Sequence, residues 1–176
     1  MDEIVGPWAG YACLPMMEDD VITWWGKGKS SFLERSLEAL EDDTNLNFER
    51  VDSKRGAEIR CKRVRKFKDK TQIGNAYWHP DNPIWRLKVK KGKNNRSTLL
   101  HEFGHSLGLM HPKNHWNTHD TIMSYGRDRS IHKWFPRDIA ALSEIYSDDI
   151  DDKLKDVIPQ PVNLDELTGL TFVDYI

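Results

Sequence analysis

The chain has 176 residues, of which 38% are hydrophobic and seven are tryptophan, and this is enough for one domain with a substantial core. The formal net charge of −2 points to no particular class of partner. No apolar run approaches the roughly 20 residues that a membrane-spanning helix needs, so we expect no membrane partner. Residues 1–8 lack a basic stretch followed by an unbroken apolar run, so we expect no signal peptide there.

The first part of the chain has the patterns of a strand, a helix and two further strands. Residues 21–25, Val-Ile-Thr-Trp-Trp, are β-branched and aromatic and predict a strand. Ser30 or Ser31 is a suitable N-cap for a helix, and the leucines that follow keep helical spacing until the polar run Asp-Asp-Thr. The patterns of residues 48–51 and 57–67 predict two more strands.

Two more extended segments lead into the second half of the chain. Residues 73–80 read Ile-Gly-Asn-Ala-Tyr-Trp-His-Pro and predict an extended segment. Residues 84–90 alternate apolar and basic side chains, as a half-buried strand does. A polar turn at 91–95 then precedes a helix, for which Ser97 is a suitable N-cap.

Residues 101–111 carry the most informative pattern in the chain, His-Glu-Phe-Gly-His-Ser-Leu-Gly-Leu-Met-His. His101 and His105 are four residues apart, so a helix places both imidazoles on one face about one turn apart. Gly108 stands where this helix should end, because glycine tolerates the left-handed conformation that terminates helices. We expect the chain to double back there and to bring in His111 as a third ligand.

Three neutral histidine ligands predict a zinc site with an open fourth position. Such a site lowers the pKa of bound water to roughly 7. Glu102, next to the first ligand, is then placed to act as a general base on that water. The pattern therefore predicts one catalytic Zn²⁺ ion and a hydrolytic reaction. The alternative is a set of ordinary helix residues, and the added Gly108 and His111 make a chance match rare.

A second motif follows at residues 120–126, Asp-Thr-Ile-Met-Ser-Tyr-Gly. Together with the extended histidine motif it resembles the metzincin clan of zinc endopeptidases, in which a methionine lies beneath the zinc in a tight Met-turn. The resemblance assigns that methionine to Met123. It also implies that Tyr125 is a fifth, mobile zinc ligand, as in the serralysin and astacin branches. Residues 135–146 are similar to the last helix of serralysins and matrixins.

The resemblance implies a metzincin (zincin-like) α+β fold, with a twisted mixed sheet of about five strands, an active-site helix and a C-terminal helix. We expect residues 1–147 to form this catalytic domain, with residues 1–20 packing on it. Residues 148–176 are expected to form an acidic C-terminal extension. The resemblance further implies a monomeric endopeptidase that acts on protein or peptide substrates, and it favours an extracellular location.

Three features separate the chain from the named families of the clan. Only 12 positions separate His111 from Met123, fewer than serralysins have. Glycine-aspartate calcium repeats are absent, so structural calcium has no support in the sequence. Matrixins usually have adjacent methionine and tyrosine, whereas a serine intervenes between Met123 and Tyr125 here. The resemblance therefore extends to the clan and not to one family.

The resemblance also suggests how a substrate would bind. The segment of Gly74, Asn75, Ala76 and Tyr77 is similar to the metzincin edge strand, which commonly carries Gly-x-Ala. An extended substrate would pair with that strand through main-chain hydrogen bonds. The alternative is an interior strand or a loop. Residues after the Met-turn would wall the specificity pocket, and Arg127 and Arg129 there favour acidic substrate side chains.

The other titratable residues have ordinary interpretations. Four histidines read as surface or structural residues, namely His79, His115, His119 and His132. For His119 or Asp120, bracing of the Met-turn or binding of a second metal stays open. Cys13 and Cys61 allow one disulfide or two buried thiols. A latent state with Cys13 on the zinc is one further hypothesis, although the matrixin latency motif is absent. A tail carboxylate on the zinc, as in the aspartate latency of some metzincins, is another.

The charge is unevenly distributed along the chain. Basic residues concentrate in segments 54–70 and 86–96, whereas residues 148–156 are mainly acidic. A basic stretch can bind polyanions, but it is more often the solvated face of strands, so nucleic acid is not the expected partner.

Two other functions stay open. A zinc-bound binding or structural module would keep the fold without turnover, but the intact Glu102 argues against it. A peptidase dedicated to one partner would show no general proteolysis.

Overall fold

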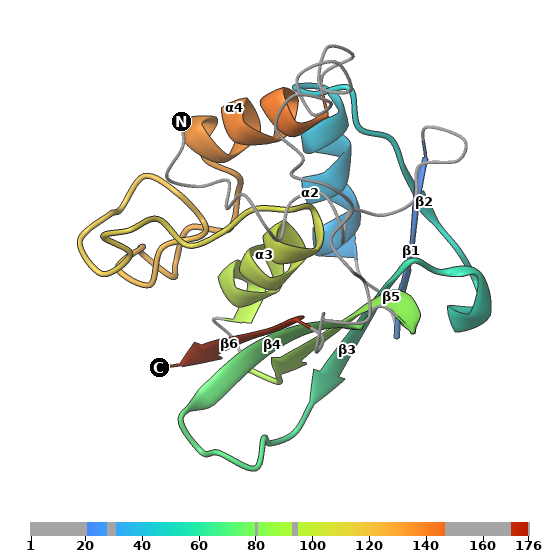
Figure 1. Cartoon of the computed structure of the whole chain (residues 1–176), viewed down its shortest axis with the longest axis horizontal. Helices are drawn as coiled ribbons and strands as arrows, with labels where there is room; N and C mark the ends of the chain where they lie inside the picture. The colour runs from blue at the N-terminus through green and yellow to red at the C-terminus, as the bar shows by residue number, and fades with distance from the viewer. Residues whose placement is uncertain (1–20, 28–30, 80, 93–94, 147–169, 176) are drawn as a thin grey trace.

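The computed structural model describes residues 21–27, 31–79, 81–92, 95–146 and 170–175. Six strands in these ranges form one mixed sheet in the order β2-β1-β3-β5-β4-β6 (Figure 1). Their bounds are β1 Ile22–Gly26, β2 Phe48–Arg50, β3 Ile59–Val64, β4 Gln72–His79, β5 Asn82–Lys90 and β6 Leu170–Tyr175. Strands β2, β1, β3 and β5 are parallel neighbours, whereas β4 runs antiparallel to both β5 and β6.

The helices lie on one side of this sheet (Figure 1). They are α2 (Ser31–Glu41), α3 (Asn95–Ser106) and α4 (Pro136–Ile145), and a short 3₁₀ turn, η1, spans Lys54–Gly56. The predicted α+β class is confirmed, and so is the mixed sheet of about five strands. The sixth strand, β6, comes from the segment expected to be a C-terminal extension. The N-terminal segment 1–20 lies outside the described residues.

Alternating side chains explain why the sheet has one buried face. In β5, Trp85, Leu87 and Val89 are buried beneath the helices, whereas Lys88 between them is exposed. The same alternation in β4 buries Ala76. Burial of large apolar side chains of this kind stabilises a domain by about 1.5–3 kcal/mol per side chain. The alternation in residues 84–90 therefore specifies both the strand and the face that it turns to the core.

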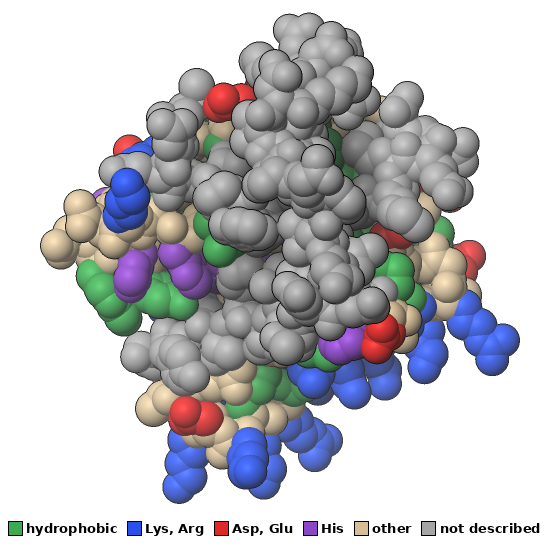
Figure 2. Space-filling model, viewed as in Figure 1, with side chains coloured by type: hydrophobic (Ala, Val, Ile, Leu, Met, Phe, Trp, Pro, Cys, Tyr) green, Lys and Arg blue, Asp and Glu red, His purple; other side chains and the backbone are tan. Residues whose placement is uncertain are grey.

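The opposite face of the sheet is basic. The parallel register of β3 and β5 places Arg60 beside Arg86 and Lys62 beside Lys88. Lys62 and Lys88 are exposed. In Figure 2, Lys and Arg side chains gather along the lower margin of the molecule, on the side away from the helices. This arrangement favours a solvated strand face as the explanation of the basic segments.

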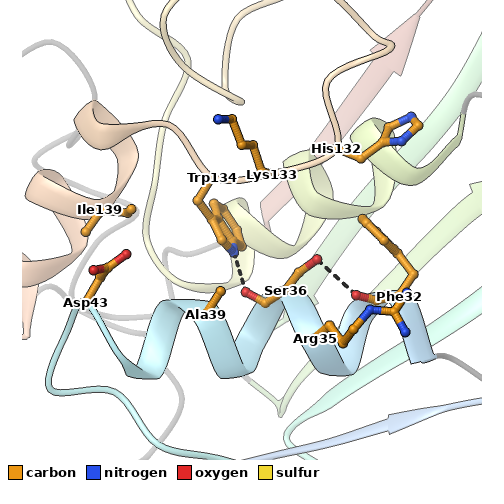
Figure 3. Close-up of a pocket in the computed structure, with 9 residues that line it drawn as sticks. All are labelled: Phe32, Arg35, Ser36, Ala39, Asp43, His132, Lys133, Trp134 and Ile139. Atoms are coloured by element: carbon orange, nitrogen blue, oxygen red, sulfur yellow. Dashed lines mark hydrogen bonds between the residues drawn. The ribbon is translucent and has the colours of Figure 1, made fainter.

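A hollow of about 390 Å³ lies between α2 and the segment that leads into α4 (Figure 3). Trp134 closes one side, because its indole Nε1 donates a hydrogen bond of 3.0 Å to the backbone oxygen of Ser36. Phe32 and Ile139 also line the hollow. None of its lining residues is a predicted ligand or catalytic residue, so the hollow is distinct from the predicted site.

The structure shows the state of one of the two cysteines. Cys61 is a buried free thiol, and burial raises its pKa to about 12, so it is an unreactive core residue. Cys13, the other half of the open disulfide question, lies outside the described residues.

Among the helices of the described residues, none has both the length and the apolar character that crossing a membrane requires.

Candidate metal centre

Three histidines converge at the C-terminal end of α3. The Nε2 atom of His111 lies 3.1 Å from Nε2 of His101 and 3.2 Å from Nε2 of His105. The candidate ligand atoms of the three residues all lie within 4.8 Å of one another. His101 and His105 are almost completely buried, at 0% and 2% exposed, whereas His111 is partly exposed. The predicted ligand set is therefore assembled, from one helix and the chain that follows it.

Main-chain carbonyl groups orient the first two rings. Nδ1 of His101 lies 2.8 Å from the backbone oxygen of Ile122, and Nδ1 of His105 lies 2.9 Å from that of Leu109. A carbonyl oxygen only accepts, so each Nδ1 carries the proton and each neutral ring presents an Nε2 lone pair. A hydrogen bond on the far nitrogen is also the usual support of a metal-bound histidine.

The lone pairs explain why the cluster suits a cation. The Nε2 atoms of His101 and His105 are both acceptors, and the Nε2 of His111 faces both of them. One proton on His111 could satisfy only one of these two contacts. Ligands around a tetrahedral zinc ion, at about 2.0–2.1 Å from the metal, lie about 3.3 Å apart, close to the separations here. The group can therefore hold a metal ion.

The surroundings keep the imidazoles neutral, which is the form that binds a metal. Burial is the main cause of the lowered pKa values of His101 and His105, and the Arg127 guanidinium lowers both further. Burial, with His115 and Arg127 nearby, lowers the pKa of His111 to about 4. A neutral imidazole keeps a lone pair for the metal.

The end of α3 explains how His111 reaches the other two ligands. Gly108 has φ of 93°, in the left-handed region that glycine tolerates. The N–H of Gly108 donates to the oxygen of His105 at 3.1 Å, and the N–H of Leu109 donates to that of Gly104 at 2.9 Å. These two bonds form the Schellman motif that ends many helices. Gly108 therefore stands where α3 ends, and the same reversal supplies the Leu109 carbonyl that orients His105.

Glu102 lies on the same helix beside the β4 strand. Its side chain is completely buried. A Cβ atom built on Gly74 would lie 2.0 Å from Oε1 of Glu102 and 2.7 Å from Cγ2 of Thr98, so only a glycine fits there. Gly74 was predicted to serve a substrate, and the structure adds that its missing side chain makes room for the Glu102 carboxylate.

The predicted Met-turn packs directly under the ligand helix. Met123 is completely buried. A Cβ atom on Gly104 would lie 2.6 Å from its sulfur, so this glycine, inside the histidine motif, lets the methionine approach. Sequence reasoning missed Gly104, although a glycine in a helix interior costs about 1 kcal/mol relative to alanine and often marks a close contact.

A buried aspartate connects the Met-turn to α4. Asp138, completely buried, accepts hydrogen bonds from the backbone N–H of Ile122 at 2.9 Å and of Phe135 at 3.0 Å, and from the hydroxyl of Thr121. Burial raises the pKa of Asp138, and the three hydrogen bonds oppose that rise. The carbonyl of Ile122 faces His101, so Asp138 holds, through the N–H of Ile122, the residue whose carbonyl orients a ligand. Its sequence signal was its position two residues after Pro136, where an N-terminal helix carboxylate caps.

Tyr125 lies over the ligand cluster. Its ring centroid is 4.6 Å from that of His111 and 5.8 Å from that of His101. The rings of His115 and Trp116 flank it, each 5.0 Å away. Trp116 is 58% exposed, so this aromatic group forms an outer wall of the site. Figure 2 shows histidine side chains reaching the surface on the side where Figure 1 draws the loops between α3 and α4.

The structure bears on the predictions made for Arg127, His119 and Asp120 near the Met-turn. Arg127 is 4% exposed, and its Nε donates to Oγ of Ser97 at 3.0 Å. It therefore braces the site from within, and Ser97 lies inside α3 as an acceptor instead of capping it. His119 Nδ1 contacts the oxygen of Gly126 at 2.6 Å, which agrees with bracing of the turn. Asp120 pairs with Arg137 at 3.2 Å.

The predicted substrate strand also has an unexpected neighbour. Asn75 and Tyr77 are partly exposed and Gly74 and Ala76 are buried, so side chains alternate along this part of β4. Within the sheet built by residues 22–90, β4 is the outermost strand on its side. In the whole described sheet, however, β6 pairs with its outer edge.

The chain matches no protein-family model and no curated protein sequence.

We predict that Asp138→Asn weakens metal binding by about 10- to 100-fold, the usual effect of losing a partner behind a ligand. Titration with Co²⁺, followed by its visible absorption, measures this affinity. Asp120→Asn is the matched control, because Asp120 is exposed and bonds only peripherally to Arg137. Equal losses in the two variants would mean that Asp138 does not orient the His101 ligand.

Proposed function

We propose that the protein is a zinc-dependent endopeptidase with a metzincin-like site, in which Glu102 is the general base. The observation that carries the proposal is the convergence of three neutral histidine nitrogens, two of them on the helix that also carries the buried carboxylate of Glu102. A purely structural site would have little use for that carboxylate, because structural zinc is normally closed by four protein ligands. The Met-turn beneath the ligand helix supports the same assignment.

The ligand chemistry supports zinc as the resident metal. All three ligand candidates are imidazoles, which suit Zn²⁺, Cu²⁺, Fe²⁺ and Ni²⁺ better than Ca²⁺ or Mg²⁺. Three protein ligands with one open position are the usual set of catalytic zinc. A bound zinc ion would supply a Lewis acid for water and for the substrate carbonyl.

The remaining catalytic roles would fall to the chain's own residues. Glu102 takes the proton of the attacking water and then delivers it to the leaving amine. Tyr125, whose ring lies beside His111, donates a hydrogen bond to the carbonyl oxygen as negative charge develops there. Met123 and Gly108 shape the site and transfer no proton. Since Arg127 is buried and bonded, it gives no reason to expect acidic specificity.

Glu102→Gln tests the proposed function most directly. We expect the zinc-loaded variant to retain one zinc per chain and to lose about 10²- to 10⁴-fold of its peptide cleavage, because the amide cannot accept the proton. Zinc content is measured by atomic emission, and cleavage is measured on an unfolded protein with and without phenanthroline. Cleavage at the unaltered rate would remove Glu102 from the mechanism.

Tyr125→Phe tests the proposed oxyanion donor. We expect kcat to fall by roughly 10²-fold while KM changes little, since the hydrogen bond strengthens only in the transition state. Steady-state kinetics on a fluorogenic peptide separate the two constants. An unchanged kcat would exclude a catalytic role for the hydroxyl.

Gly74→Ala tests the position of the Glu102 carboxylate. The added methyl group would overlap Oε1 of Glu102, and a displacement of about 1 Å lowers a catalytic rate on the order of 100-fold. Gly56→Ala is the matched control, because a Cβ atom there meets nothing within 4 Å. If both variants cleave peptides equally well, the contact between β4 and Glu102 has no catalytic importance.

A further inference from the structure

The outer edge of β4 is occupied by the chain's own C-terminal strand. β6 runs antiparallel to β4 over almost its whole length, with Leu170 opposite Trp78 and Tyr175 opposite Gln72. In Figure 1, β6 lies at the border of the sheet, next to β4. The main-chain groups on this edge of β4 are therefore already engaged.

The pairing passes directly beside the proposed general base. Asp174 of β6 is the partner of Gly74, the residue against which the Glu102 carboxylate packs. β6 is also in contact with α3, the helix that carries His101 and His105. Its path thus follows β4 along the part of the sheet that borders the candidate metal centre.

An extended substrate and β6 would require the same backbone groups. Peptides that add to a sheet edge bind through the unpaired N–H and C=O groups of that strand. Each edge accepts only one additional strand, so the two occupants exclude each other. Glu102 packs against Gly74 of β4, and the other edge of β4 is taken by β5.

We propose that residues 170–175 act as a built-in competitor, a pseudosubstrate strand that holds the β4 edge until it is displaced. This inference rests on the proposed peptidase function and names its regulation. Because the strand is tethered to the same chain, its effective concentration at the edge is roughly millimolar. A segment with an intrinsic Kd of about 0.1 mM would then fill the edge in about 90% of molecules.

The test keeps the chain at full length and weakens only the pairing. In the double variant Phe172→Pro with Val173→Pro, two consecutive backbone N–H groups are removed. Successive residues of a strand direct their N–H groups to opposite edges, so one of the two faces β4. Val173→Ile is the matched control, because it retains the N–H and the β-branched shape.

The kinetic result separates competition from a general change in the site. We expect the proline variant to cleave a fluorogenic peptide with about tenfold higher kcat/KM, entirely through a lower KM, while Val173→Ile matches the parent chain. Unaltered KM in the proline variant would overturn the inference.

A binding measurement makes the inference independent of turnover. A fluorescein-labelled peptide with the sequence of residues 170–176 is added to zinc-loaded Glu102→Gln proteins, with and without the two prolines. Fluorescence polarisation should show binding at least tenfold tighter to the proline form. Equal affinity for both forms, or no binding to the proline form, would overturn the inference. Selective binding without cleavage in any active-site-intact variant would uphold the docking edge and reject the peptidase function.

Discussion

The hydrogen bonds from two histidine Nδ1 atoms to backbone carbonyls are the interactions on which the candidate site depends. They decide the tautomer of His101 and His105, and so they decide that both Nε2 lone pairs face the same point. Each carbonyl belongs to a segment that folds back onto α3 from outside it. The metal site is therefore a tertiary arrangement, even though two of its ligands are one helical turn apart.

Each segment that supplies a carbonyl is held by a different device. The Leu109 peptide is positioned by the left-handed Gly108, a purely local solution. Ile122 is held through its N–H by Asp138, sixteen residues later, and the same carboxylate caps the start of α4. Gly104 and Met123 bring helix and turn close enough for these bonds to form. The stability of α4 is consequently coupled to ligand geometry, because the loss of a buried charged hydrogen bond costs about 1.5–3 kcal/mol.

Local patterns were readable from the sequence, and long-range contacts were not. The alternation of residues 84–90, the helical leucine spacing of α2 and the break at Gly108 each depend on neighbouring residues, so their structures were predicted closely. The engagement of Arg127 with Ser97 depends on a fold-specific contact thirty residues away, and it was mistaken for a pocket wall. The carbonyls of Leu109 and Ile122 leave no mark at all, because every residue has one. The side chains at these two positions can therefore change while the carbonyls stay. A comparison of side chains would not reveal that these two residues support the site.

The pairing of β6 with β4 also has a colloidal consequence. An open strand edge offers unpaired backbone groups to any other chain with an extended segment, and such edges promote association between copies. While β6 is in place, that border of the sheet is closed. Displacement of β6 would expose an unpaired, aggregation-prone strand edge together with the site. The chain with β6 displaced should therefore aggregate at a lower protein concentration than the chain with β6 in place. Solubility and access of a substrate to the β4 edge would then be opposed properties of the same strand.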